Sequence, residues 1–242
     1  MPKPVFKRVL LKLSGEILAG KDGFGIDPIR ASFLAKEVKS IHELGLEIGL
    51  IIGAGNIFRG IQAASKGMDR VTGDYLGMLA TIMNAIALQD ALEKVGCETR
   101  ALSAISVMQI AEPYIRRRAI RHMEKGRIII VSGGTGNPFF TTDSAAALRA
   151  TELGAEIVIK GTKVDGAYNK DPMIYEDAEK FKKIDPTWNF IAIGNEARKN
   201  IFPDPCVVKE IGYKKNKEVL NYYTKSEIAV GNSVWNEPLG RI

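Results

Sequence analysis

Residues 130–146 read IVSGGTGNPFFTTDSAA and join an apolar strand to a helix of small residues. Ile130 and Val131 end the apolar run, three glycines and a threonine follow, and Asp143 stands where the helix opens. Glycine at a strand-to-helix turn lets the backbone approach a phosphate, and the helix dipole favours negative charge at that place. The stretch therefore predicts an α/β unit whose turn binds an anionic ligand.

Apolar strands alternate with amphipathic helices along the first two thirds of the chain. The periodicity indicates strands at residues 5–13, 46–52, 99–102, 127–131 and 156–160. It indicates helices at residues 29–44, 74–94, 112–125 and 143–153. This alternation is typical of an α/β fold with a mostly parallel sheet covered on both faces, in which ligands bind at the carboxyl ends of the strands.

The composition of the 242 residues is that of a soluble globular protein, and one compact unit with two lobes accounts for the length. Cys97 and Cys206 form no paired motif, so we expect inert thiols and a cytoplasmic location. The amino terminus lacks a signal-peptide pattern, and the longest apolar stretch, 44–52, is too short to cross a bilayer. The net charge of +6 suits polyanions, but we expect the arginines of residues 116–121 to form a solvated helix face rather than a nucleic-acid platform.

Glycines follow strand after strand, in the segments 12–15 (KLSG), 53–56 (GAGN), 133–136 (GGTG) and 161–166 (GTKVDG). Because parallel strands end at one edge, these turns indicate a long polyphosphate ligand or two ligands that meet. The P-loop motif G-x-x-x-x-G-K-[ST] does not occur. A dinucleotide fingerprint is disfavoured, because Phe58 stands where its third glycine belongs and Asp74 precedes a helix instead of ending a strand.

Four polar residues near these turns allow a functional and a structural interpretation. Lys12 ends a buried strand, where an ammonium group either meets an anion or reaches past the strand to water. Arg59 offers a planar donor fork suited to phosphate oxygens. Asp74 and Asp143 each stand near the start of a helix, so each either caps that helix or accepts bonds from a ligand.

Five segments, in this order and spacing, resemble the bacterial uridylate (UMP) kinases of the amino acid kinase superfamily. They are KLSGE, IIGAGNIFRG, TGDYLGMLATIMNAIALQDAL, SGGTGNPFFTTDSAAALRA and KGTKVDGAYNKDP, and the resemblance spans about residues 4–183. It implies a three-layer α/β/α sandwich, similar to carbamate kinase, with a mostly parallel central sheet. Residues 1–242 would form a single amino acid kinase domain, with a UMP-binding acceptor half at 1–153 and an ATP-binding half at 154–242.

The resemblance also implies roles for individual residues. Catalysis would fall to Lys12, Asp143 and Lys160. ATP would meet Lys12, Leu13, Ser14, Gly15, Gly55, Arg59, Thr162, Tyr168 and Asp171. UMP would meet Ala54, Asp74, Thr135, Gly136, Asn137, Pro138, Phe139, Phe140, Thr141 and Thr142. An allosteric GTP would bind near Gly20, Lys21, Asp22, Gly23, Phe24 and Gly25.

The implied reaction is transfer of the ATP γ-phosphoryl group to UMP, giving UDP and ADP in pyrimidine nucleotide (UTP and CTP) synthesis. Magnesium would arrive with ATP, without a metal site of the protein. GTP would activate the enzyme, UTP would inhibit it, and the subunits would form a homohexamer. We expect neither nucleic acid nor a membrane as a partner.

Two departures from the family pattern stand out. Ala54 occupies a position where the family usually has a glycine. From about Ile184 onward the family's closing helix, strand and Gly-Thr motif are missing, so residues 185–242 are atypical. The divergence leaves two other functions open: a UMP-binding regulatory protein with an impaired ATP site, or a superfamily kinase that acts on a carboxylate or carbamate.

Overall fold

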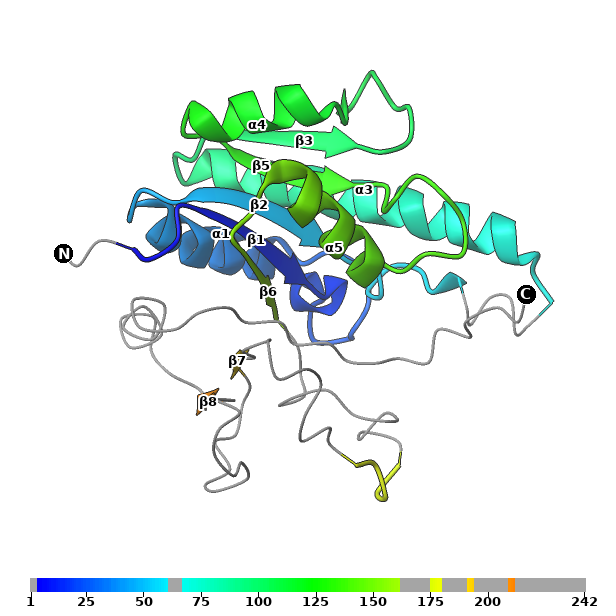
Figure 1. The fold of residues 1–242 in the computed structure, drawn as a ribbon. Coiled ribbons are helices and arrows are strands. Elements are labelled where there is room, and N and C mark those ends of the chain that lie inside the picture. The colour runs from blue at the N-terminus through cyan, green and yellow to red at the C-terminus, as the bar shows by residue number, and fades with distance from the viewer. Residues whose placement is uncertain (1–3, 61–66, 162–174, 180–190, 194–208, 212–242) are drawn as a thin grey trace. The chain divides into compact units, whose positions relative to one another are not determined.

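The computed structural model describes residues 4–60, 67–161, 175–179, 191–193 and 209–211 (Figure 1). The chain forms two compact units, Met1–Val158 and Ile159–Ile242. In the second unit, β7 (Ile191–Ile193) and β8 (Lys209–Ile211) pair in parallel. The first unit contains most of the described elements and the candidate site.

The central sheet has six strands in the order β4-β3-β5-β2-β1-β6, and all are parallel, as expected from the alternation of strands and helices. Its strands are β1 (Arg8–Leu13), β2 (Glu47–Ile52), β3 (Thr99–Ser103), β4 (Glu112–Pro113), β5 (Ile128–Ser132) and β6 (Ile157–Lys160). The strands β2 and β5 are buried along their whole length, which agrees with their mostly apolar sequences, EIGLII and IIIVS.

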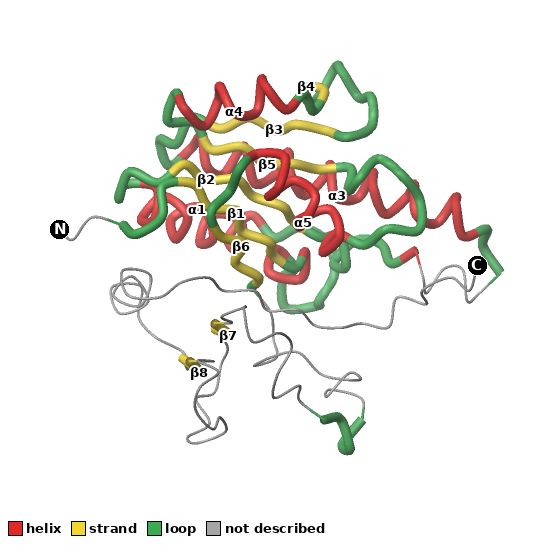
Figure 2. Tube along the Cα trace, in the orientation of Figure 1, coloured by secondary structure: helices red, strands yellow, loops and turns green. Residues whose placement is uncertain are grey.

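Helices cover both faces of the sheet, so the expected three-layer arrangement is present (Figures 1 and 2). They are η1 (Gly15–Leu18), α1 (Pro28–His42), α3 (Arg70–Lys94), α4 (Arg116–Glu124) and α5 (Thr142–Leu153). α1 and α3 pack together on one face, and α4 and α5 lie on the other. Between the sheet and α4 and α5 lies a core of fully enclosed side chains, among them Leu10, Leu102, Met123, Ile129 and Leu153.

The helix α3 begins earlier than the sequence indicates, at Arg70 instead of Asp74. Asp69 caps it by accepting a hydrogen bond from the backbone N–H of Thr72 at 2.8 Å. The capping interpretation of Asp74 is therefore wrong, because Asp74 lies inside the helix and its carboxylate faces other partners. The apolar pattern misses the first turn because Val71 and Thr72 are exposed and Gly73 has no side chain.

The helix predicted at residues 112–125 is also shorter than expected. Glu112 and Pro113 form β4, paired with Leu102 and Ser103 of β3, and α4 begins only at Arg116. The physical reason is Pro113, which lacks an N–H and excludes the residue before it from the helical region. The arginines at 116, 117, 118 and 121 are exposed, which agrees with a solvated helix face.

The helix α3 is long and apolar enough, by length and composition, to cross a membrane, a feature that the sequence reading had assigned to no segment. Its buried side chains instead pack on α1 and on β3 and β5, which identifies it as a core helix of the first unit. Cys97, just after this helix, is a buried free thiol, whereas Cys206 lies outside the described residues.

Candidate active site

Three strand-end turns converge at the carboxyl edge of the sheet. A Cβ atom built on Gly53, after β2, would lie 3.4 Å from the backbone N of Gly15 and 3.6 Å from the hydroxyl of Thr142. Gly15 follows β1, and Thr142 opens α5 after β5. The turns therefore present backbone and hydroxyl donors to one small region, as phosphate binding requires.

Lys12 and Asp143 meet at this convergence. The Nζ atom of Lys12 lies 2.7 Å from Oδ1 of Asp143, and the Lys12 side chain is only 11% exposed. Thr141 caps α5, its hydroxyl accepting the N–H of Ser144 at 3.2 Å, so the interpretation of Asp143 as a mere cap is wrong. The pair fixes the position of the Lys12 ammonium group at the strand end, where a positive charge can stabilise developing negative charge.

A buried pair of amides joins the turn after β2 to α3. Asn84 of α3 donates to the carbonyl of Gly53 at 2.7 Å and to Oδ1 of Asn56 at 2.8 Å. Asn56 donates in return to Oδ1 of Asn84 at 3.0 Å. Both side chains are almost fully enclosed, so each lost bond would leave a buried polar group unsatisfied. The sequence reading missed this pair; a lone Asn inside the apolar run LATIMNAIAL is the signal that could have indicated it.

The residues expected on the ATP phosphate side lie around the same turns. Leu13 ends β1 and its carbonyl accepts the N–H of Gly53 at 2.9 Å. Ser14 caps η1. The guanidinium of Arg59 forms an ion pair with Glu16 and donates from Nε to the carbonyl of Gly55 at 3.3 Å. The Arg59 guanidinium is therefore held near these turns by the Glu16 carboxylate.

A cavity of about 150 Å³ opens beside the convergence, on the side of α3. Residues expected to bind UMP contribute much of its lining: Ala54, Asp74, Thr135, Asn137, Phe140 and Thr142. The sequence assigned the other lining residues to no UMP contact; they are Phe58, Gly60, Gly73, Gly77, Met78, Thr81 and Gly134. Ala54 is buried, and its methyl group occupies wall space that a glycine would leave open.

The remaining four residues of the expected UMP set do not line this cavity. Gly136 and Pro138 shape the loop between β5 and α5, and Thr141 caps α5. Phe139 turns its ring outward and is 62% exposed, although its backbone N–H reaches Asp74. Of the two phenylalanines expected to contact UMP, only Phe140 lines the cavity.

Asp74 connects the helix α3 to the loop that follows β5. Its Oδ2 accepts the backbone N–H of Phe139 at 2.8 Å, and both oxygens lie 3.0 Å from Nε of Arg70. The sequence reading missed Arg70, although its spacing of four residues from Asp74 on a helix permits such a pair.

A second network that the sequence did not indicate contacts the loop between β5 and α5. Arg149 of α5 is buried, its guanidinium lies 4.2 Å from the ring centre of Tyr114, and it pairs with Glu152 at 2.7 Å. Its Nη2 approaches the carbonyls of Gly134 and Thr135 at 3.5 and 3.4 Å. Burial alone would raise the pKa of Glu152, yet hydrogen bonds from Arg149 and Tyr114 hold that pKa below its ordinary value.

The loop expected to bind an effector lies between η1 and α1. Gly23 and Gly25 have positive φ angles of 70° and 74°, and Phe24 is 70% exposed. Gly25 donates its N–H to the carbonyl of Asn56 at 2.8 Å and accepts the Asn56 side chain at 2.8 Å. The loop is thus bonded to the turn after β2.

Some expected residues lie elsewhere in the chain. Lys160 ends β6 and is buried. Thr162, Tyr168 and Asp171 lie outside the described residues. Throughout the part of the chain that the structure describes, no three His, Cys, Asp or Glu side chains gather in a way that could hold a metal ion.

Comparisons with known proteins agree with this geometry. The model of the amino acid kinase family matches residues 7–187. The chain is 56% identical over 183 residues to a uridylate kinase of Roseobacter denitrificans and 58% identical over 183 residues to one of Dichelobacter nodosus; each match covers 76% of both chains.

Solved structures give the same result. The UMP kinase of Bacillus anthracis superimposes with a TM-score of 0.66 at 39% identity, covering 77% of this chain and 75% of the other. The UMP kinase of Ureaplasma parvum superimposes with a TM-score of 0.66 at 34% identity, covering 78% and 77%. Sequence, fold and site together show that the chain belongs to the amino acid kinase family and, within it, to the uridylate kinases.

Proposed function

We propose that this protein transfers the γ-phosphoryl group of MgATP to UMP, giving UDP and ADP. One observation supports it above the others: the Lys12–Asp143 pair adjoins a cavity lined by Asp74 and the loop after β5, in a chain more than half identical to uridylate kinases. A transfer site and an acceptor pocket that share one wall are what a nucleotide kinase requires.

The chemistry needs little beyond positioning and charge. An oxygen of the UMP phosphate attacks the γ-phosphorus in line, and the loose transition state spreads charge over the transferred group. Lys12 meets that charge, while Asp143 fixes the direction of its ammonium group at 2.7 Å. The backbone N–H groups of the turns add fixed dipoles. No general base is needed, because the attacking oxygen is already ionised, and we assign Lys160 the role of a second neutralising charge.

The acceptor side is proposed to read the nucleotide through its sugar and base. Asp74 accepts the ribose hydroxyls, since its carboxylate lines the cavity. Thr135 and Asn137 offer polar atoms to the uracil, and Phe140 covers it. Thr142 donates its hydroxyl to the UMP phosphate close to Gly53.

The ATP side is proposed to use Ser14, Gly15, Gly55 and Arg59 for the phosphates, together with residues outside the described part for the base and ribose: Thr162, Tyr168 and Asp171. Arg59 then exchanges its partner Glu16 for phosphate oxygens. Magnesium is proposed to enter as part of MgATP, where it would supply positive charge to the phosphates without a ligand from the protein.

Regulation and assembly are part of the same proposal. GTP is proposed to activate through the loop Gly20–Gly25, which bonds to Asn56 beside the phosphate turns, and UTP to inhibit. A homohexamer is supported by the exposed apolar side chains of α3, namely Tyr75, Leu76, Leu79 and Met83. The cytoplasm is the proposed location, on the grounds of the cysteine pattern.

Turnover measurements distinguish this function from two alternatives. A UMP-binding regulator would follow if the atypical residues 185–242 impair the ATP site, and a carboxylate or carbamate kinase would accept other substrates. The test is a coupled ADP-release assay with MgATP and UMP, CMP or carbamate in parallel, with and without GTP. UMP-dependent release supports the kinase; release with carbamate alone contradicts it, as does an absence of release when UMP still protects the fold against heat.

A further inference from the structure

We propose that Arg70 is a positioning residue of the acceptor site: it holds Asp74 and Phe139 together and so fixes the loop after β5 around the bound nucleotide. This inference rests on the proposed function, because it names a residue that shapes the UMP pocket without touching UMP. Arg70 does not line the cavity, so its effect passes through Asp74.

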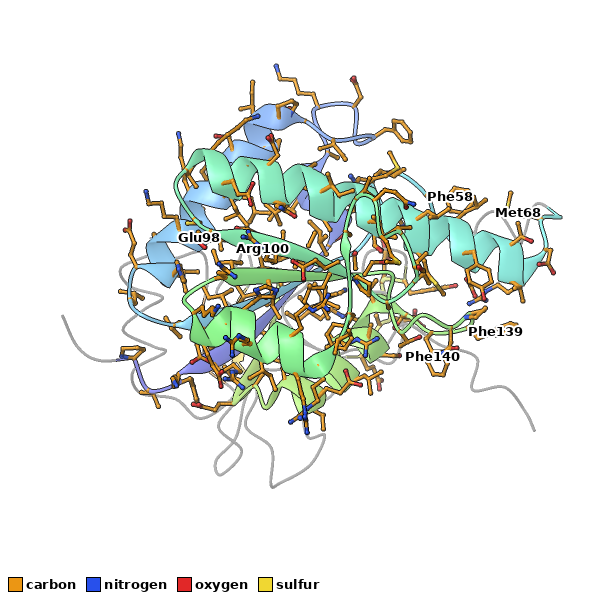
Figure 3. All side chains as sticks on the ribbon, turned by 90° about the horizontal axis from the view of Figure 1, so that it is seen from above. Phe58, Met68, Glu98, Arg100, Phe139 and Phe140 are labelled. Carbon is orange, nitrogen blue, oxygen red and sulfur yellow. The ribbon has the colours of Figure 1, made fainter. Side chains whose placement is uncertain are left out.

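The backbone conformation of Phe139 must be stabilised by contacts with other residues. Among the described residues other than glycine, Phe139 alone has a positive φ, of 70°. A bulky side chain in this left-handed region costs free energy and persists only where the surroundings enforce it. Burial of the ring does not enforce it, because the side chain is mostly exposed at the tip of the loop (Figure 3).

Two contacts from α3 provide this stabilisation. The Phe139 N–H donates to Oδ2 of Asp74 at 2.8 Å, which fixes the peptide. The guanidinium of Arg70 lies 5.6 Å from the centre of the Phe139 ring, within the range of a cation–π contact. Figure 3 shows Phe139 beside the amino-terminal turns of α3, where Arg70 is the first helical residue.

Arg70 closes this triangle through its pair with Asp74. Its Nε lies 3.0 Å from both carboxylate oxygens, and the Asp74 side chain is only 12% exposed. A carboxylate offers about four acceptor positions, so Asp74 can hold Arg70 and Phe139 and still accept from a ribose. Without Arg70, the same carboxylate would be an unpaired charge at the cavity wall, free to rotate away from Phe139.

The test compares Arg70→Gln with Lys94→Gln. Lys94 pairs with Asp90 at 2.5 Å on the same helix and with the same spacing, but far along the helix from the loop, so it is a matched control. For Arg70→Gln we expect KM for UMP to rise about tenfold, while kcat and KM for ATP stay within about twofold. For Lys94→Gln we expect all three constants to stay within about twofold.

Calorimetric titration with UMP in the absence of ATP provides a readout besides turnover. Arg70→Gln should weaken UMP binding by the same factor as it raises KM, and Arg70→Lys, which keeps the charge but not the planar fork, should lie between it and the wild type. Unchanged UMP affinity in Arg70→Gln, or equal losses for UMP and ATP, would overturn the proposal.

A double-mutant cycle with Phe139→Ala separates positioning from a general loss of structure. If Arg70 acts through the Phe139 peptide and ring, the double variant should lose clearly less UMP affinity than the product of the two single losses. Losses that multiply would overturn the proposal. If the wild type releases ADP with UMP and Arg70→Gln behaves normally, only this inference fails; if the wild type neither binds UMP nor turns it over, the proposed function fails first.

Discussion

The turns after β1 and β2 and the loop after β5 lie at the same sheet edge but are held in different ways. Asn56 and Asn84, which join the turn after β2 to α3, are 1% and 0% exposed and bond to each other and to the backbone. Phe139 and Phe140 at the tip of the loop are 62% and 57% exposed, and the loop depends on contacts from neighbouring helices. The transfer region is thus part of the core, whereas the acceptor region is shaped by side chains around it.

This difference predicts that substitutions in the transfer region and in the acceptor region change different measured quantities. Substitutions among the buried turns should lower stability or turnover. Substitutions around the acceptor loop should weaken UMP selectively. The tests below go from the largest expected effect to the smallest.

The largest effect is expected for Lys12→Ala. Removing the ammonium group takes away the charge proposed to meet the transferred phosphoryl group, so kcat should fall by roughly 10²–10³ at saturating UMP and ATP. Steady-state ADP release measures it. A fall in kcat of less than about tenfold would mean that groups other than Lys12 stabilise the negative charge of the transition state.

Next comes a pair of glycines, one from each region. A Cβ at Gly15 would lie 2.3 Å from Oδ1 of Asn56 and 2.4 Å from the carbonyl of Gly53, so Gly15→Ala forces the buried turns apart and should cost about 3 kcal/mol or more. A Cβ atom added at Gly134 would meet no neighbouring atom within 4 Å, and only the positive φ of 59° disfavours a side chain there. Gly134→Ala should therefore lower the free energy of unfolding by about 1 kcal/mol. Urea unfolding measures both; equal costs would contradict the contrast.

The buried amides give a smaller but similar contrast. Asn84→Leu leaves the Gly53 carbonyl and the Asn56 side chain without their partner, and we expect a loss of about 2 kcal/mol in the free energy of unfolding. Asn137→Ala, in the exposed acceptor loop, should change it by about 0.5 kcal/mol or less. If Asn84→Leu is as stable as the wild type, the amide pair does not stabilise the turn after β2.

The smallest effect is expected at Glu47, at the opposite end of β2 from both regions. Burial alone would raise the pKa of Glu47, but hydrogen bonds and charge from Lys7 and Arg8 lower it below its ordinary value of 4.5. A lowered folded-state pKa gives stability that is present above pH 4.5 and lost as the pH falls below it.

Glu47→Gln should therefore lose less stability than the wild type between pH 7 and pH 3. Unfolding in urea across this pH range measures the difference. UMP and ATP constants at pH 7 should not change. A change in KM for either nucleotide would show that the two ends of the sheet are coupled.

The sequence predicted the fold and the transfer region well for physical reasons. Buried parallel strands leave unbroken apolar runs, and glycine turns after them mark the ligand edge, so Lys12, Gly15 and Gly53 could be placed together without coordinates. The resemblance grouped Asp143 with Lys12 as catalytic residues, and the structure places the Asp143 carboxylate 2.7 Å from Nζ of Lys12.

The acceptor side was harder to predict. The strain at Phe139, the amide pair and the contact of Arg149 with the loop all join residues far apart in the sequence, and no local pattern records such contacts. The apolar pattern places the start of α3 too late because Val71 and Thr72 are exposed and Gly73 has no side chain. It places the helix at 112–125 too early because apolar spacing does not record the boundary that Pro113 imposes.

The most direct test of this division of labour is a UMP titration by calorimetry, run beside turnover, on Lys12→Ala and Asp74→Ala. We predict that Lys12→Ala binds UMP almost as the wild type does but turns over very little. Asp74→Ala should bind UMP weakly and recover much of its turnover at high UMP. If both variants lose binding and turnover in the same proportion, the transfer region and the acceptor region are not separate, and the account is wrong.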